Sequence, residues 1–256
     1  MLAWEQAQFD RVVADLFGYH AVQLGLHELD TLAANRMPHR WLATASPESA
    51  ACARPQASGG QRGGANNQPP RAALVTEFAA LPFPQASLDL VVLPHALELH
   101  PDPHATLREV ERVLVPEGRV VICGFNPASL WGWRQRRAHF YRQIGLGELF
   151  LPNAGEFIGY RRLRDWLRLL SFEVESAQFG CYRPAVRKPR WLDRFEWMDR
   201  AGARWWPIFG AVYFVVAVKR VRGMRLLGPV WKPAKNLSNA PVSIANKSVK
   251  TGTIFE

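Results

Sequence analysis

The stretch 81–127 reads LPFPQASLDLVVLPHALELHPDPHATLREVERVLVPEGRVVICGFNP and predicts a strand, a helix and a second strand. Residues 88–93 and 119–124 are short, almost wholly apolar runs without a helical period, as in strands covered on both faces of a parallel sheet. Between them, Asp102 can cap a helix whose first residue is Pro103, and Leu107 and Val110 recur at helical spacing. Such a unit crosses over right-handed, so this stretch predicts an α/β fold.

Several motifs in and around this stretch resemble one family. The runs 77–84 (EFAALPFP), 88–92 (LDLVV) and 112–118 (RVLVPEG) resemble the central signature of class I S-adenosylmethionine-dependent methyltransferases. The runs 16–20 (LFGYH) and 124–127 (GFNP) resemble the YafS-like bacterial group of that family. The resemblance, which spans about Leu16 to Lys219, implies a Rossmann-like fold with a seven-stranded, mostly parallel sheet and helices on both faces.

The other strands of this sheet are expected where apolar runs recur along the chain. We predict them at residues 21–26, 39–44, 72–76, 172–175 and 211–218. Phe9, Val12, Val13, Leu16 and Phe17 fall on one face of a helix, which is expected to pack over the sheet edge or to cover the cofactor cleft.

Composition sets the domain organisation and the setting. We predict one methyltransferase-like domain over 1–222, with a disordered insertion at 49–70 that is rich in Ala, Ser, Gly, Gln and Pro, and a basic, largely disordered tail at 223–256. The three cysteines have no CxxC spacing, which favours a reducing cytoplasm. No leader is visible at Met1, and the apolar run 207–218 is too short to span a bilayer.

The cofactor implied by the resemblance is S-adenosylmethionine. Gly25 stands where the family begins its glycine loop and Gln23 where the family has an acidic residue, but His27 and Leu29 replace the later glycines. By resemblance, Glu77 would accept from the adenine amino group and Phe78 would pack on the ring. Pro94 and His95 follow the fourth strand at the ligand-binding end of the sheet and complete the predicted cofactor site.

Three side chains after the fourth strand are candidate general bases. His95, Glu98 and His100 lie at the carboxyl end of a strand, where open α/β sheets bind ligands, and imidazole titrates near neutral pH. A histidine here can also shape the cleft without taking part in the chemistry. No cluster with the spacing of metal ligands is seen, so no metal is expected.

The leading interpretation is a methyltransferase that acts on an unidentified acceptor, with a small molecule favoured over nucleic acid. Two alternatives stay open. A methyltransferase-like scaffold without activity is suggested by the incomplete glycine loop. An RNA-binding or membrane-peripheral protein is suggested by the formal charge of +10 and by the Arg- and Trp-rich segments 131–137 and 183–206, which suit nucleic acid or an anionic membrane surface.

Overall fold

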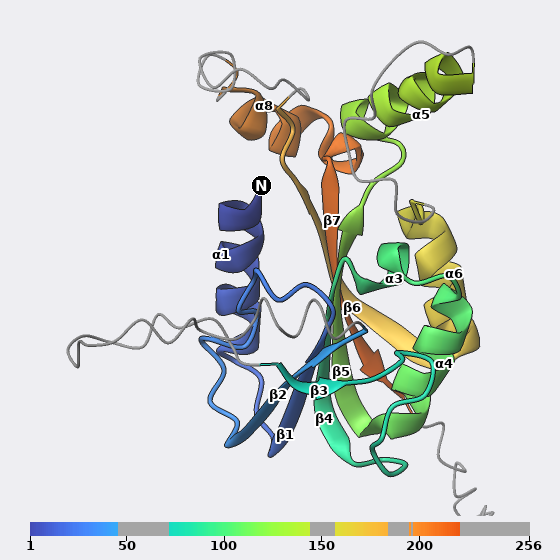
Figure 1. Ribbon diagram of the computed structural model, residues 1–256. Coiled ribbons are helices and arrows are strands. Elements are labelled where there is room, and N and C mark those ends of the chain that lie inside the picture. Colours follow the sequence, from blue (N-terminus) through green and yellow to red (C-terminus); the bar gives the residue numbers. More distant parts are fainter. Residues whose placement is uncertain (46–71, 144–156, 184–194, 196, 221–256) are drawn as a thin grey trace, which may run out of the picture. The chain divides into compact units, whose positions relative to one another are not determined.

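The structure, a computed structural model, describes residues 1–45, 72–143, 157–183, 195 and 197–220 (Figure 1). Side chains are described up to Arg137 of the helix that ends at Gln143. The predicted insertion at 49–70, the tail at 223–256 and the domain boundary at 222 lie outside these residues. The predictions about them stand as predictions.

A seven-stranded sheet forms the centre of the molecule, with strand order β3-β2-β1-β4-β5-β7-β6. The strands are β1 His20–Leu24, β2 His39–Thr44, β3 Ala72–Val75, β4 Leu88–Pro94, β5 Leu114–Phe125, β6 Phe172–Gly180 and β7 Val212–Lys219. The pairs among β1 to β5 are parallel, and β7 runs antiparallel to both β5 and β6. The predicted α/β fold with a mostly parallel sheet is therefore confirmed.

Helices cover both faces of this sheet (Figure 1). The helix α1 (Leu2–Val13) lies on one face, and α4 (Pro103–Val113) and α6 (Tyr160–Leu169) lie on the other. The remaining helices are α3 (Ala96–Leu99), α5 (Leu130–Gln143), α8 (Trp197–Trp205) and the short 3₁₀ helix η1 (Pro207–Phe209).

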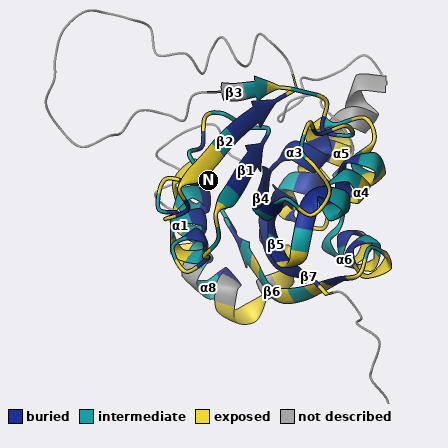
Figure 2. Cartoon of the chain, turned by 90° about the horizontal axis from the view of Figure 1, so that it is seen from below, coloured by how far each residue is buried: buried dark blue, intermediate teal, exposed yellow. Residues whose placement is uncertain are grey.

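The alternation of side chains along the strands produces two cores. In β4, Val91 and Leu93 belong to the core under α4 and α6, whereas Leu90 and Val92 belong to the core under α1. Both sets are fully buried, as expected for a parallel strand in the middle of a sheet. Figure 2 shows the buried residues gathered in the central strands.

Two local predictions differ from the structure. The helix α1 begins at Leu2 and ends at Val13, so Phe17 lies outside it and is exposed. β5 begins at Leu114, although the strand was expected from residue 119. Its pairing with β4 is irregular at this point: from Leu88 to Leu90 the partners in β5 move from Leu114 to Arg119, so residues 115–118 bulge out between the two paired positions.

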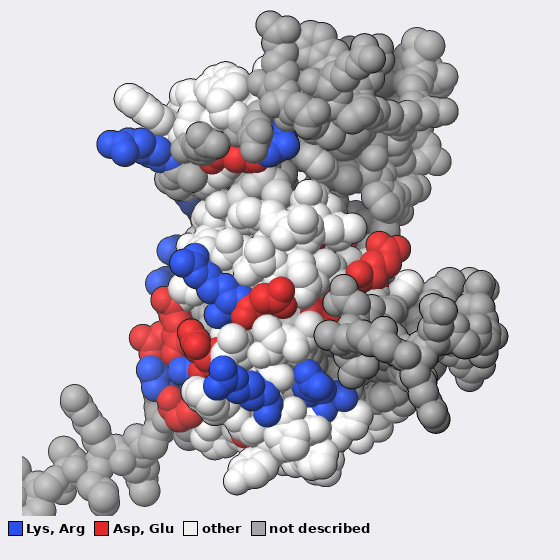
Figure 3. Space-filling view, turned by 90° about the vertical axis from the view of Figure 1, so that its left-hand side faces the viewer, with Lys and Arg blue, Asp and Glu red and all other residues white. Residues whose placement is uncertain are grey.

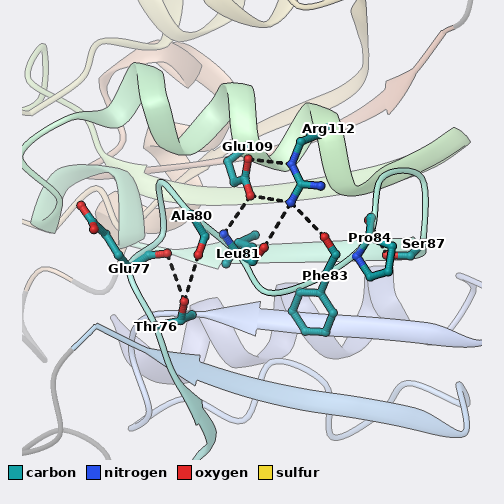
Figure 4. Close-up of polar contacts among 9 residues, drawn as sticks. All are labelled: Thr76, Glu77, Ala80, Leu81, Phe83, Pro84, Ser87, Glu109 and Arg112. Atoms are coloured by element: carbon teal, nitrogen blue, oxygen red, sulfur yellow. Dashed lines mark hydrogen bonds and ion pairs between the residues drawn. The ribbon is translucent and has the colours of Figure 1, made fainter.

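The LPFP segment (residues 81–84) is held by hydrogen bonds with side chains of helix α4 (Figure 4). Glu109 accepts a hydrogen bond from the Leu81 backbone N–H at 2.8 Å, and Arg112 donates to the carbonyls of Leu81 and Phe83 at 3.1 and 2.9 Å. The Phe83 ring packs on Trp41 of β2, with ring centroids 5.6 Å apart. This segment therefore joins α4 to the sheet and sets the entry to β4.

Helix α4 starts as its sequence predicts. Asp102 is the N-cap, its carboxylate accepts from the Ala105 N–H at 3.0 Å, and Pro103 opens the helix.

Among the described residues, no helix is both long and apolar enough to cross a bilayer.

Candidate functional site

The turn after β1 is the first part of the candidate site. Gly25 has φ +103°, a conformation that L side chains rarely adopt, and a Cβ there would lie 3.2 Å from the Cβ of Ala96. Its N–H donates to the Ala43 carbonyl of β2 at 2.9 Å. The turn also lies where the strand order reverses between β1 and β4, which is where open α/β sheets form a ligand crevice.

Gln23 holds the loop that follows Gly25. Its amide nitrogen donates to the carbonyls of Leu26 and Leu29 at 2.6 and 2.7 Å. Its amide oxygen accepts from the backbone N–H and the hydroxyl of Thr31 at 3.1 and 2.7 Å. All four hydrogen-bonding positions of the side chain are thus used within the loop, so Gln23 orders the backbone of the predicted cofactor site.

His95 is the centre of a buried polar cluster at the end of β4. Its Nδ1 lies 3.0 Å from Oε2 of Glu98 in α3, and its Nε2 lies 3.3 Å from Oε1 of Glu5 in α1. Glu98 also accepts a hydrogen bond from the Phe125 N–H at the end of β5. The backbone of His95 has φ 53°, a strained conformation of the kind that collects at functional sites.

The electrostatics of this cluster favour a charged imidazole. Burial alone would lower the pKa of His95, but its hydrogen bonds with Cys123, Glu5 and Glu98 outweigh that effect and raise the pKa to about 12. With a proton on each nitrogen, the ring can donate to both carboxylates at once. At neutral pH His95 is then a hydrogen-bond donor that connects α1, β4 and α3.

Cys123 of β5 completes the cluster, with its Sγ 4.0 Å from Nε2 of His95. Burial raises the pKa of this thiol to about 12, so it is protonated. One potential ligand atom from each of Glu5, His95 and Cys123 lies within 4.8 Å of the others, a spacing that a metal ion could bridge. The sequence shows no such cluster because its members lie far apart along the chain. The proton on His95 already compensates one of the carboxylate charges.

Two buried polar atoms of this region have no hydrogen-bond partner among the described residues. They are Oε2 of Glu5 and the hydroxyl of Tyr213, both in fully buried side chains. Tyr213 of β7 pairs with Gly124, and a Cβ on Gly124 would lie 2.5 Å from its hydroxyl. Buried polar groups without partners are uncommon and are typical of sites that complete their hydrogen bonds with a ligand.

Glu77, Phe78 and His100, which were also predicted as site residues, make their contacts outside this cluster. Glu77 follows β3 with an exposed side chain that points away from the hydrogen bonds of the LPFP segment (Figure 4). Phe78 is buried and faces the His100 ring, with centroids 5.8 Å apart. His100 accepts from the Asp102 N–H and contacts Thr106, which places it at the start of α4. The structure thus brings His95 and Glu98 together, while His100 contacts other groups.

Glu5 is the site residue that sequence reasoning missed. It lies four residues before Phe9 and eight before Val13, on the same helical face, and all three are fully buried. A glutamate on an apolar helix face was the signal that could have found it.

By the family resemblance, Asp89 would help to organise the first loop, but the structure places it elsewhere. Its carboxylate accepts from the backbone N–H groups of Tyr19 and His20 at 2.8 and 2.9 Å, at the beginning of β1. That is the opposite end of the strand from Gly25.

Comparisons with known proteins agree with this geometry. Residues 33–122 match the family model of a methyltransferase domain. The chain is 39% identical over 97 residues to the uncharacterized protein YafS of Escherichia coli, a match that covers 38% of each protein. It is 31% identical over 116 residues to a demethylmenaquinone methyltransferase of Anoxybacillus flavithermus, which covers 40% of this chain and 49% of that protein. The matches span less than half the length of these relatives.

Solved structures share the fold at low sequence identity. A SAM-dependent methyltransferase of Archaeoglobus fulgidus superposes with a TM-score of 0.55 at 15% identity, covering 86% of this chain and 95% of that one. The [4+2]-cyclase SpnF gives a TM-score of 0.52 at 16% identity, over 85% and 80% of the two chains. Because one of these neighbours is named for a cyclisation, the fold by itself does not choose the reaction. Residues 33–122 nevertheless match a methyltransferase domain, and the chain has a seven-stranded fold similar to that of a solved SAM-dependent methyltransferase.

Proposed function

We propose that the protein is an S-adenosylmethionine-dependent methyltransferase that acts on a small-molecule acceptor. The observation that carries the proposal is the turn at Gly25, which combines a positive φ, close approach to Ala96 and a location at the switch point of the sheet. A backbone without a Cβ at this point can approach a ligand closely.

The residues around this turn fit the cofactor in part. Gln23 orders the loop that would face the methionine and ribose portions, and Glu77, exposed after β3, would accept from the adenine amino group. Phe78 is buried beside it and can contact the ring. By resemblance, an acidic residue at the end of the second strand would take the ribose hydroxyls; this chain has Thr44 and Ser46 there, and Glu48, a possible substitute, lies outside the described residues.

When bound, S-adenosylmethionine supplies a methyl group that is already activated on a sulfonium. The protein then has to orient a nucleophile and exclude water. His95, with a carboxylate on each ring nitrogen, fixes the end of β4 that faces the crevice and connects it to α1. In this protonated state it positions groups, and a role as general base would require loss of that proton.

A small-molecule acceptor is favoured by two observations. The segment after β4 reads Leu93-Pro94-His95, whereas amino-directed nucleic-acid methyltransferases usually have Asn/Asp-Pro-Pro-aromatic there. On the face seen in Figure 3, acidic and basic side chains are also interspersed. A nucleic-acid site needs a patch of positively charged side chains, and the described residues of this face do not present one. The cytoplasm remains the expected compartment, because Cys123 and Cys181 are free thiols.

An inactive scaffold is the second candidate. It is favoured by His27 and Leu29, which replace two loop glycines, and by the burial of Leu29 within the loop. The two candidates predict different cofactor binding: the methyltransferase binds S-adenosylmethionine, whereas a scaffold whose loop has closed does not.

Isothermal titration with S-adenosylmethionine and S-adenosylhomocysteine separates these candidates. We expect the wild type to bind both ligands and Gly25→Val to lose binding, because valine cannot adopt φ +103° without strain and its side chain would meet Ala96. Leu169→Val on the exposed side of α6 is the control and should bind like the wild type. Absence of binding by the folded wild type would overturn the methyltransferase proposal in favour of the scaffold.

A further inference from the structure

An apolar pocket opens between the start of α5, helix α8 and η1. Its volume is about 460 Å³, within the range of sites that hold small organic ligands. The lining includes the large apolar side chains of Leu130, Trp133, Met198, Trp206 and Phe209. In Figure 1 these three helices lie beyond the carboxyl ends of the parallel strands, at the same end of the sheet as His95.

The side chains that line the pocket favour a hydrocarbon ligand. Among the described residues that line the pocket, none is charged, and the hydroxyls of Ser129 and Tyr182 already make hydrogen bonds. The Ser129 hydroxyl donates to the Asn126 carbonyl at 2.6 Å and accepts from the Gly132 N–H at 3.1 Å. The Tyr182 hydroxyl donates to the Phe179 carbonyl at 3.3 Å. Apart from indole N–H groups, the pocket therefore has little with which to bind the polar part of a ligand.

The rim of the pocket exposes large aromatic side chains. Trp133, Trp197, Trp206 and Phe209 line it and are 60%, 61%, 59% and 54% exposed. Contiguous apolar surface of this kind is uncommon unless it binds something. Contact with hydrocarbon would remove part of it from water, at about 25 cal/mol for each Å² buried.

The pocket is joined to the candidate site through the end of β5. The side-chain amide of Asn126 donates to the carbonyls of Ile208 and Gly210 at 2.6 and 3.0 Å, which fixes η1 against this strand end. The preceding residue, Phe125, packs on the His95 ring with centroids 4.4 Å apart. The floor of the pocket begins at Ala128, three residues beyond Phe125.

From this arrangement we propose that the pocket between α5, α8 and η1 binds the hydrocarbon part of the methyl acceptor. The acceptor is then an amphiphile, whose polar head carries the atom to be methylated and lies toward the end of β4. This inference rests on the proposed function, since it assigns the substrate class of the same enzyme.

Displacement of the fluorescent probe anilinonaphthalenesulfonate by farnesol tests the pocket. We expect farnesol, which has a long isoprenoid chain, to displace the probe at much lower concentration than prenol, its one-unit analogue. Filling the pocket by Ala201→Phe should weaken farnesol binding by about ten-fold or more, because the new ring occupies the space of the chain. Ala80→Phe, at an exposed position after β3, is the matched control and should bind like the wild type.

A second filling variant, Met198→Trp, keeps the test decisive if Ala201→Phe does not fold. Equal affinity of the folded filling variants and the wild type for farnesol would overturn the proposal, as would equal displacement by farnesol and prenol. Titration of the same proteins with S-adenosylhomocysteine keeps the two proposals apart. Farnesol binding without cofactor binding would refute the methyltransferase function, and cofactor binding without farnesol binding would refute only the lipid-like acceptor.

Discussion

His95 connects three elements, because its ring faces Glu5 of α1, Glu98 of α3 and Cys123 of β5. Its pKa is raised from 6.5 to about 12, so the folded state binds this proton more tightly than the unfolded state does. The stabilisation is therefore complete below about pH 6.5 and is lost progressively as the pH rises toward 12. Relative to His95→Asn, the wild type should lose stability between about pH 6 and about pH 9.5 in urea unfolding.

Asparagine is the suitable replacement at this residue, since it tolerates the left-handed conformation that His95 adopts. Burial also raises the pKa of Cys123. Because Cys123 is present in both proteins, the comparison of wild type with His95→Asn isolates the contribution of His95. His27→Asn in the loop after β1 is the control, and its difference from the wild type should not change with pH. A difference between wild type and His95→Asn that stays constant over this range would contradict the charged-histidine assignment.

Two side chains of helix α4, Glu109 and Arg112, hold the LPFP segment by hydrogen bonds to its backbone (Figure 4). The hydrogen bond from Arg112 lowers the pKa of the Glu109 carboxyl, which keeps it ionised and able to accept from the Leu81 N–H. Arg112→Ala removes the donors to two loop carbonyls. We expect the free energy of unfolding to fall by about 1–3 kcal/mol, measured by urea denaturation.

Arg108→Ala is the matched control on the exposed face of the same helix and should change the free energy of unfolding by less than about 0.5 kcal/mol. If both variants unfold at the same urea concentration, the contacts of Arg112 do not stabilise the segment.

Across the whole molecule, burial is concentrated in the middle of the sheet (Figure 2). β4, β5 and β7 contribute fully buried side chains to both cores, whereas β3 is an edge strand and Trp197 and Trp205 of α8 are exposed. Amide hydrogen exchange followed by mass spectrometry should therefore be slowest in β4, β5 and β7 and much faster in β3 and α8. Equal protection of β3 and β4 would show that the sheet opens only as one cooperative unit.

Local signals were sufficient for much of this molecule. β2 was predicted with its observed bounds, and the cap at Asp102 with Pro103 was read correctly, because apolar runs and capping chemistry depend on neighbours in the chain. The bulge in β5 was missed, since Pro116 to Gly118 looks like a turn until the pairing with β4 is known.

The amino-acid sequence was sufficient to predict the α/β sheet, the methyltransferase resemblance and the position of Gly25 at the start of the loop after the first strand. These depend on periodicity, motifs and residue type, all of which are local. The folded arrangement showed that Glu5 meets His95, that Gln23 uses all its hydrogen bonds inside the loop, and that the start of α5, helix α8 and η1 line an apolar pocket. The Glu5–His95 contact and the pocket join segments far apart in the chain, which the order of strands in the sheet brings together. The Gln23 contacts are short in sequence, but they depend on the folded path of the loop, which residue types alone do not specify.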